Sequence, residues 1–255
     1  MIPEAFALTG RTALISGAGA PDGIGFAAAR AMAQLGASVH VAGKSERVLQ
    51  RAEELGGVGH VLDLTDEASV AALVATLGSL DILVNNAGMT SVQDPVEHSG
   101  ESGSVAELGY AGWSRSIARN LDTAFLLTRS CLPLLRSSGA GRIVMVASVT
   151  GPVMAMRHDA AYAATKAALV GLTRSIALDE AEHGVTCNAV APGWIATGSQ
   201  TEHEAMQGMR TPMGRSAVPE EVGSVIAWLS TPGTSYLTGQ CIVVDGGNSI
   251  AEERS

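Results

Sequence analysis

Short apolar runs alternate along this chain with longer segments of helical character, and this alternation restricts the possible folds more than any other feature. The apolar residues of each run occupy successive positions instead of every second one, which indicates a strand buried on both faces. Strands of that kind form parallel sheets whose crossover helices cover both faces. The predicted strands are residues 12–16, 38–42, 58–62, 80–84, 142–147, 185–190 and 241–244.

The segments between these strands predict the covering helices. They are residues 23–35, 45–55, 65–77 with Thr65 as its N-terminal cap, 113–135, 159–182 and 219–230. No linker or internal repeat interrupts the pattern. Residues 1–255 are therefore predicted as one α/β domain with a Rossmann-type, doubly wound, parallel seven-stranded sheet. The longest polar stretch without a strand, residues 92–112, is predicted as a loop insertion.

Composition excludes several classes of protein. Hydrophobic residues make up 46% and charged residues 16% of the 255 positions, which excludes a disordered chain. The net charge of −9 argues against a nucleic acid or an anionic membrane as partner, since each needs a basic surface. Cys131, Cys187 and Cys241 form no paired motif, and neither a leader segment nor a spanning helix is apparent. A cytoplasmic location is therefore expected.

A glycine-rich turn at residues 16–25 joins the first predicted strand to the first helix. Glycine lets the backbone approach a phosphate closely, and the free N–H groups at a helix start carry partial positive charge. Many glycine-rich turns are only tight turns, but a position inside a strand–helix–strand unit favours a dinucleotide site. The expected contacts are Ser16, Gly17, Gly19, Gly23, Ile24 and Gly25.

The tip of the second predicted strand bears on the choice of cofactor. An acidic residue there would bind the ribose 2′-hydroxyl of NAD(H), whereas this chain has Lys44 and Ser45. These residues suit a 2′-phosphate, so NADP(H) is expected in preference to NAD(H). Asp22 weighs against this interpretation through charge repulsion, and a solvated turn lysine is the alternative interpretation of Lys44.

Tyr162 and Lys166 lie one turn apart on the helix predicted at 159–182, so their side chains share a face. A nearby ammonium favours the phenolate and lowers the pKa of tyrosine, which would suit Tyr162 for proton transfer. Ser148 follows the fifth predicted strand, at the carboxyl edge where such sheets bind their ligands. A packed tyrosine beside an exposed lysine is the alternative interpretation.

Taken in order, these features resemble the short-chain dehydrogenase/reductase family along nearly the whole chain. The matching positions are residues 16–25, Asp63, residues 85–88 (Asn-Asn-Ala-Gly), Asn120, Ser148, Tyr162, Lys166, Pro192, Gly193 and residues 244–247 (Val-Asp-Gly-Gly). The resemblance implies that Tyr162 is the general acid–base and that Lys166 tunes it and holds the nicotinamide ribose. It also implies that Ser148 hydrogen-bonds the substrate oxygen and that Asn120 keeps a water beside the lysine.

The same resemblance implies the remaining cofactor contacts. They are Asp63, Leu64, Asn86, Ala87, Gly88, Pro192, Gly193, Ile195 and Thr197, besides Tyr162 and Lys166 themselves. Three features depart from the family pattern. Gly23 stands two residues late relative to Gly17, which leaves open the glycine that faces the pyrophosphate. Ser148 precedes Tyr162 by 14 positions, one more than usual, and the segment from Asn85 to Asn120 is longer than usual.

The extra residues of that segment fall in the predicted insertion. Asp94, Glu97, His98 and Glu101 raise the idea of a metal site, but a solvated acidic loop explains them as well, and no metal is predicted. A flap over the substrate, a subunit contact and a plain surface loop are the other interpretations.

The expected activity is hydride transfer between NADP(H) and a ketone or secondary alcohol with an apolar body. Met89 and residues 153–156 and 194–209 are expected to line the substrate pocket. The chain is most similar to the 3-oxoacyl-[acyl-carrier-protein] reductase branch. An acidic carrier needs a basic landing surface, which residues 137–140 and 182–183 do not offer, so dependence on a carrier is not expected.

Two alternatives stay open: an NAD-dependent dehydrogenase of a sugar, steroid or cyclic alcohol, and a non-catalytic dinucleotide-binding sensor. The family resemblance, together with the small residues along the helix at 159–182, implies a homotetramer.

Overall fold

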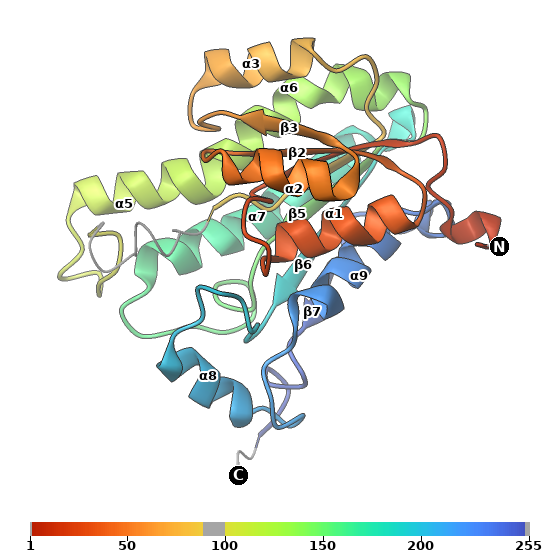
Figure 1. Cartoon of the computed structure of the whole chain (residues 1–255). Helices are drawn as coiled ribbons and strands as arrows, with labels where there is room; N and C mark the ends of the chain where they lie inside the picture. The colour runs from red at the N-terminus through yellow and green to blue at the C-terminus, as the bar shows by residue number, and fades with distance from the viewer. Residues whose placement is uncertain (1, 89–99, 253–255) are drawn as a thin grey trace.

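A single parallel sheet runs through the computed structural model, which describes residues 2–88 and 100–252. Its strand order is β3-β2-β1-β4-β5-β6-β7, and helices cover both faces (Figure 1). The strands are β1 Thr12–Ser16, β2 Ser38–Gly43, β3 Val58–Val61, β4 Ile82–Asn85, β5 Arg142–Val146, β6 Thr186–Pro192 and β7 Cys241–Val244. All seven predicted strands and the doubly wound fold class are confirmed.

The helices form two layers around two apolar cores. The α-helices are α1 Ile24–Gln34, α2 Arg47–Leu55, α3 Glu67–Ala75, α5 Tyr110–Ile117, α6 Thr123–Ser137, α7 Ala160–Asp179, α8 Glu202–Met209 and α9 Pro219–Leu229. Short 3₁₀ turns lie at Glu4–Phe6, Ala181–His183 and Pro232–Thr234. Within β1, Leu14 packs into the core beneath α3, α6 and α7, whereas Ala13 and Ile15 pack into the core beneath α1, α2 and α9. This two-sided burial explains the continuous apolar strands.

The sheet order places a ligand crevice at β1 and β4. The chain moves outward from β1 to β3 and then returns to β4 on the other side of β1. The carboxyl ends of β1 and β4 therefore diverge into connections on opposite faces, which is where open α/β sheets bind ligands.

Helical boundaries differ from the sequence predictions at three places. The helix predicted at 113–135 begins at Tyr110, ends at Ser137 and contains a π-helical turn at Ala118–Asp122. Asp66, not Thr65, caps α3, because the Asp66 carboxylate accepts from the Ser69 N–H. Helix α8 lies in a segment where no helix was predicted.

The predicted insertion at 92–112 has its upper bound three residues too late. Residues 110–112 belong to the first turn of α5, and residues 100–109 form a described loop that precedes it. Residues 89–99 lie outside the described part of the chain. No helix in the described ranges has the length and apolar character that a membrane span requires.

Candidate active site

The ends of β1 and β4 are tied together by Asn86. Its amide Nδ2 donates to the carbonyl oxygens of Ser16, at 3.1 Å, and Gly17, at 3.0 Å. Its backbone N–H donates to Ser16 Oγ at 3.0 Å, and that hydroxyl donates in turn to the Val84 carbonyl at 3.2 Å. Ser16 and Asn86, both expected at a cofactor site, thus fix the floor of the crevice.

Two glycines of the turn at 16–25 are required by close packing. Gly17 has φ +69°, and a Cβ there would lie 2.8 Å from the Ala87 backbone. A Cβ on Gly25 would lie 2.8 Å from the Gly17 carbonyl oxygen. Gly23 is the N-terminal cap residue of α1, and a Cβ on Gly19 would meet nothing closer than 3.4 Å. The longer turn therefore keeps a close glycine at each end and frees the N–H groups at the start of α1.

The segment after β6 lies against this turn. A Cβ on Gly198 would overlap the Asp22 carboxylate, so the two segments meet directly. Gly193 donates its N–H to the Val244 carbonyl at 2.9 Å, and Ile195 pairs with Ala217 in an isolated bridge. Pro192 is the last residue of β6. The segment that carries Ile195 and Thr197, two of the implied cofactor contacts, therefore comes close to the glycine-rich turn.

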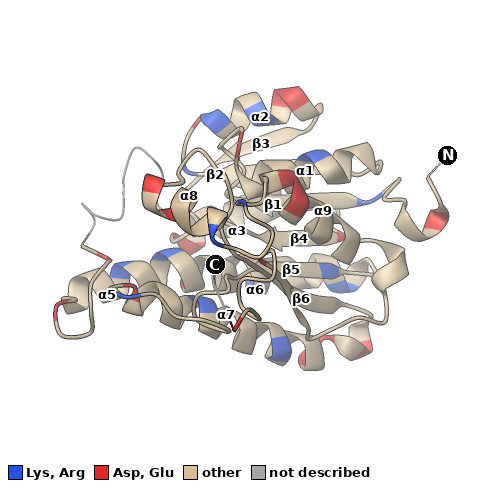
Figure 2. Ribbon diagram, turned by 90° about the horizontal axis from the view of Figure 1, so that it is seen from below, with Lys and Arg blue, Asp and Glu red and all other residues tan. Residues whose placement is uncertain are grey.

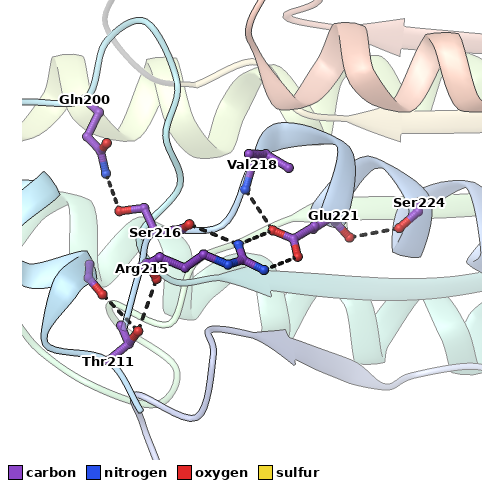
Figure 3. A network of polar contacts seen from close by, with 8 residues as sticks. Gln200, Thr211, Arg215, Ser216, Val218, Glu221 and Ser224 are labelled. Carbon is purple, nitrogen blue, oxygen red and sulfur yellow. Dashed lines mark hydrogen bonds and ion pairs between the residues drawn. The ribbon is translucent and has the colours of Figure 1, made fainter. Parts of the chain in front are cut away.

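Arg215 and Glu221 anchor the segment between β6 and α9 (Figure 3). Both Arg215 terminal nitrogens donate to the Glu221 carboxylate at 2.7 Å, and Thr211 Oγ1 donates to the Arg215 carbonyl at 3.1 Å. Gln200 donates to Ser216 Oγ at 2.8 Å. The Arg215 hydrogen bonds lower the pKa of Glu221 to about 2. This network holds the chain that carries α8.

A basic corner lies at the tip of β2. Lys44 is exposed and pairs with Asp63 at 2.9 Å, and Asp63 also accepts from the Thr65 N–H and hydroxyl. These hydrogen bonds, those from Thr65 first, lower the pKa of Asp63 to about 2. Arg47 donates from Nε to Ser45 Oγ at 3.2 Å. Arg47 was missed by the sequence reasoning, although its place three residues after Lys44 was a signal for it.

Ser148, Tyr162 and Lys166 come together at the carboxyl end of β5. Ser148 lies close enough to the Tyr162 hydroxyl to lower its pKa, and Ser148 Oγ also accepts the Thr150 N–H at 3.1 Å. Lys166 is buried, donates to the Val146 carbonyl at 3.0 Å and places its ammonium 5.4 Å from the centre of the Tyr162 ring. Most of the 14 positions from Ser148 to Tyr162 belong to the loop between β5 and α7.

The electrostatics of Tyr162 differ from the sequence expectation. Burial, followed by the carboxylates of Asp159 and Glu204, raises the pKa of Tyr162 to about 12, although the Ser148 hydrogen bond opposes the shift. Burial lowers the pKa of Lys166 to about 8. The expected lowering of the tyrosine pKa is therefore wrong for the protein alone. Lys166 lies over the ring. Asp159 stands three positions before Tyr162, whereas Glu204 comes from α8, which sequence spacing did not connect to Tyr162.

Asn120 occupies the π-helical turn Ala118–Asp122, a type of turn that often marks functional sites. Its Nδ2 donates to the Ser116 carbonyl at 3.1 Å, while its buried Oδ1 has no hydrogen-bond partner within the described residues. A Cβ on Gly88 would lie 2.8 Å from that oxygen. The turn thus holds an open acceptor beside the backbone that follows β4.

These residues fit a nicotinamide dinucleotide. The glycine cradle leaves room for backbone contact with a diphosphate, the start of α1 offers N–H groups, and Asn120 Oδ1 is a buried acceptor without a donor in the described residues.

Of the residues considered for a metal, only Glu101 is described by the structure. Glu101 pairs with Arg119 at 2.8 Å, whereas Asp94, Glu97 and His98, like the pocket residue Met89, lie outside the described residues.

Comparisons with known proteins agree with this site. The family model described as enoyl-(acyl carrier protein) reductase matches residues 17–249. Oxidoreductase UcpA of Salmonella typhimurium is 38% identical over 97% of this chain and 98% of the relative. The cis-4-hydroxycyclohexanecarboxylate dehydrogenase of Sinomonas cyclohexanicum is 38% identical over 96% of this chain and 98% of its own. A tropinone reductase homolog of Arabidopsis thaliana is 35% identical over 96% and 95% of the two chains.

Solved structures show the same similarity. One is the structure of a Beutenbergia cavernae protein described as an NAD(P) dependent gluconate 5-dehydrogenase, with NADP bound at low occupancy. Its TM-score against this chain is 0.86, and the two sequences are 36% identical. It is matched over 97% of this chain and all of its own length. The glycine turn, the β4 end, the Ser148–Tyr162–Lys166 cluster and full-length matches of this identity lead to one conclusion: the chain belongs to the short-chain dehydrogenase/reductase family.

Proposed function

We propose that this protein is an NADP(H)-dependent ketone reductase and alcohol dehydrogenase in which Tyr162 is the general acid–base. As a member of its family, the protein is an oxidoreductase that acts on CH–OH groups and binds NAD(P). The observation that carries the finer proposal is the contact of Tyr162 with Ser148 above the buried ammonium of Lys166.

The reaction follows from this arrangement. A ketone oxygen placed between the hydroxyls of Ser148 and Tyr162 accepts a hydrogen bond from each. Bound nicotinamide supplies the hydride that reaches the carbonyl carbon. Tyr162 then gives its proton to the oxygen as negative charge develops there, and the Lys166 ammonium stabilises the phenolate that remains. In the reverse direction, the Tyr162 phenolate takes the proton from the alcohol.

The state of Tyr162 favours the reductive direction at neutral pH. With its pKa raised to about 12, the tyrosine holds its proton and can act as the acid without prior protonation. Alcohol oxidation needs the phenolate and therefore gains from alkaline conditions. Asn120, with its open Oδ1, is proposed to hold the water that returns protons to Lys166.

NADP(H) preference rests on the basic corner formed by Lys44, Ser45 and Arg47. Lys44 is exposed at the tip of β2, and Arg47 contacts the Ser45 hydroxyl from the first turn of α2. Two cations and a hydroxyl suit a phosphate dianion better than a bare ribose hydroxyl. NADP bound to the Beutenbergia cavernae relative supports the same choice.

The substrate is proposed to be a free ketone or alcohol with a largely apolar body. Val153, Met156, Met206 and Met209 are exposed on the segments around the crevice and offer adaptable apolar contact. Asp159 and Glu204, whose charges reach Tyr162, oppose a substrate that carries a carboxylate near its carbonyl. The substrates in the names of two similar proteins, a hydroxycyclohexane carboxylate and gluconate, both carry a carboxylate. They therefore test whether this site disfavours such substrates.

Dependence on a carrier protein is not part of the proposal. An acidic carrier would need a basic surface, but Arg136, a cation at the end of α6, already donates two hydrogen bonds of 2.7 Å to the Glu180 carboxylate. An NAD-linked dehydrogenase of a cyclic alcohol or sugar acid remains the second candidate, since the names of two similar proteins give a cyclic alcohol and a sugar acid as substrates.

A homotetramer and a cytoplasmic location complete the proposal. Several exposed apolar residues are of the kind that subunit interfaces cover. They are Leu178 on α7, Trp228 on α9, Tyr236 before β7, and Val243 on β7. The three cysteines are free, as in a reducing compartment. Sedimentation at micromolar concentration should give a tetramer, and a monomer would contradict the assembly.

The function is tested by following NADPH and NADH oxidation with cyclohexanone, 4-oxocyclohexanecarboxylate, 5-ketogluconate and a 3-oxoacyl thioester. The proposal expects faster turnover with NADPH and with cyclohexanone than with either carboxylate. Turnover confined to NADH and the two carboxylates would favour the second candidate. Binding of both cofactors without turnover of any probe in either direction would favour the sensor.

A further inference from the structure

The loop 100–109 contacts both helical elements that carry the proposed catalytic residues. It leads into α5, and α5 packs beside α7 (Figures 1 and 2). Its first residue lies directly on α5, because a Cβ on Gly112 would overlap the Gly100 carbonyl oxygen. The approach is thus as close as two backbones allow, and it requires glycine at position 112.

The side chain of Glu101 connects this loop to the π-helical turn. Its carboxylate, only 4% exposed, pairs with the Arg119 guanidinium at 2.8 Å. Arg119 directly precedes Asn120, and its carbonyl accepts the Thr123 hydroxyl at 2.9 Å. A buried carboxylate is costly unless paired, so this contact holds the turn in one position.

The backbone of Gly103 connects the loop to the start of α7. Its N–H donates to the His158 carbonyl at 2.8 Å, and Gly103 pairs with Asp159 in an isolated bridge. His158 is the one non-glycine residue in the described ranges with positive φ, at +59°. Such a conformation is strained and persists only where its surroundings hold it. Asp159 is the N-terminal cap residue of α7, and Tyr162 follows within the same turn.

We propose that residues 100–109 form a brace that positions Asn120 and Tyr162 relative to each other, with Glu101 as its main positioning residue. The loop reaches the asparagine turn through a buried ion pair and the tyrosine helix through a backbone bridge, and it stands on α5 between them. This proposal rests on the catalytic roles proposed above, but the brace itself is a structural property that can be measured without turnover.

Glu180 offers a matched control. Its carboxylate is also 4% exposed and also pairs with an arginine, Arg136, but it joins the ends of α6 and α7 far along the chain from Tyr162. Both Glu101→Gln and Glu180→Gln remove one buried negative charge and keep the side-chain shape. Any general effect of losing a buried ion pair should therefore appear in both variants.

Hydrogen exchange of the backbone amides tests the brace directly. Glu101→Gln is expected to speed exchange in residues 118–123 and 159–164 by roughly tenfold, the factor that loss of a charge-assisted hydrogen bond implies. Glu180→Gln should leave those amides unchanged and speed exchange near 136 and 180. Unchanged exchange of residues 118–123 in Glu101→Gln would overturn the brace.

Kinetics then separate a positioning role from simple stability. With the fastest probe of the panel above, Glu101→Gln should lower kcat by roughly ten- to a hundredfold and leave the KM for the cofactor unchanged. The alkaline limb of the pH profile for alcohol oxidation should also move to lower pH. Asp159, whose charge raises the pKa of Tyr162, is then no longer held near the tyrosine. Arg119→Gln should act alike, and the loss in the double variant should be smaller than the sum of the losses in the two single variants.

Two results separate the positioning role of Glu101 from the proposed function of the protein. Equal kcat losses and equal pH profiles in Glu101→Gln and Glu180→Gln would overturn the positioning role. If the wild-type protein turned over none of the probes, the proposed function would fall, while faster exchange at both segments in Glu101→Gln alone would still establish the brace.

Discussion

Tyr162 illustrates how neighbours from distant parts of the chain set the behaviour of one residue. Ser148 comes from the end of β5, Asp159 from the start of α7 and Glu204 from α8, and all three act on the same hydroxyl. The spacing of Tyr162 and Lys166 could be read from the sequence, because a helix brings positions four apart together. The Glu204 carboxylate could not, because its approach depends on the placement of α8, whereas Asp159 stands only three positions before Tyr162.

Asp159→Asn tests this electrostatic account. The carboxylate raises the pKa of Tyr162, so its removal should lower that pKa and shift the alkaline limb of alcohol oxidation toward lower pH. The pH profile of kcat/KM for cyclohexanol measures the shift. Glu182→Gln removes an exposed charge that does not act on Tyr162, and its profile should match the wild type. A limb that stays in place in Asp159→Asn would contradict the account.

Lys44→Ala tests the basic corner. The variant should raise the dissociation constant of NADPH by roughly tenfold, as expected for loss of one charge-assisted contact, and change that of NADH little. Fluorescence titration of both cofactors on the same protein provides the measurement. Equal weakening of NADPH and NADH would show that Lys44 does not contact a 2′-phosphate.

Among the structural elements, the glycine turn and the π-helical turn show what a sequence pattern reveals and what it hides. The glycine turn was recognised because it joins a strand to a helix within a strand–helix–strand unit, although only the structure distinguishes Gly17 and Gly25 from Gly19. The π-helical turn at Ala118–Asp122 was not predicted, since it lies inside a helical stretch and no residue type marks it. Helix α8 was missed because its residues show no clear apolar period, although the capping box of Thr201 and Glu204 was a sequence signal for its start.

Gly17→Ala should destabilise the fold through this turn. The left-handed conformation alone costs a residue with a side chain about 1–2 kcal/mol, and the new Cβ would also press on the Ala87 backbone at 2.8 Å. Gly19→Ala is the matched control, because its Cβ meets only ordinary contacts and its φ is not positive. Urea unfolding should show a clearly lower free energy of unfolding for Gly17→Ala alone, and equal losses in both variants would contradict the packing argument.

At the scale of the whole molecule, the fold was predictable and the detail around the insertion was not. Continuous apolar strands such as β5 report burial on both faces, and that property determines the sheet class. The contacts of Glu101 depend on long-range geometry, so the sequence left several interpretations of the insertion open. For residues 100–109, the structure shows a loop packed on α5 and joined to α7.

The edge of the sheet carries a pH-dependent pair that affects the stability of the whole domain. His40 on β2 and His60 on β3 stack with a 2.9 Å contact between ring nitrogens, and burial lowers the pKa of both. A lowered histidine pKa gives stability that is fully present above the unfolded value of about 6.5 and is lost as pH falls below it. Urea unfolding from pH 8 to 5 should show this loss, and His60→Gln should reduce its slope. An unchanged slope would assign the loss to other groups.

The central claim is that Tyr162 transfers the proton, and Tyr162→Phe tests it most directly. The variant removes one hydroxyl and keeps the ring over Lys166. NADPH binding should be retained, while kcat for cyclohexanone reduction should fall by roughly a thousandfold, within the range for loss of a general acid. A variant that binds NADPH and still reduces the ketone at a rate near that of the wild type would show that another group supplies the proton.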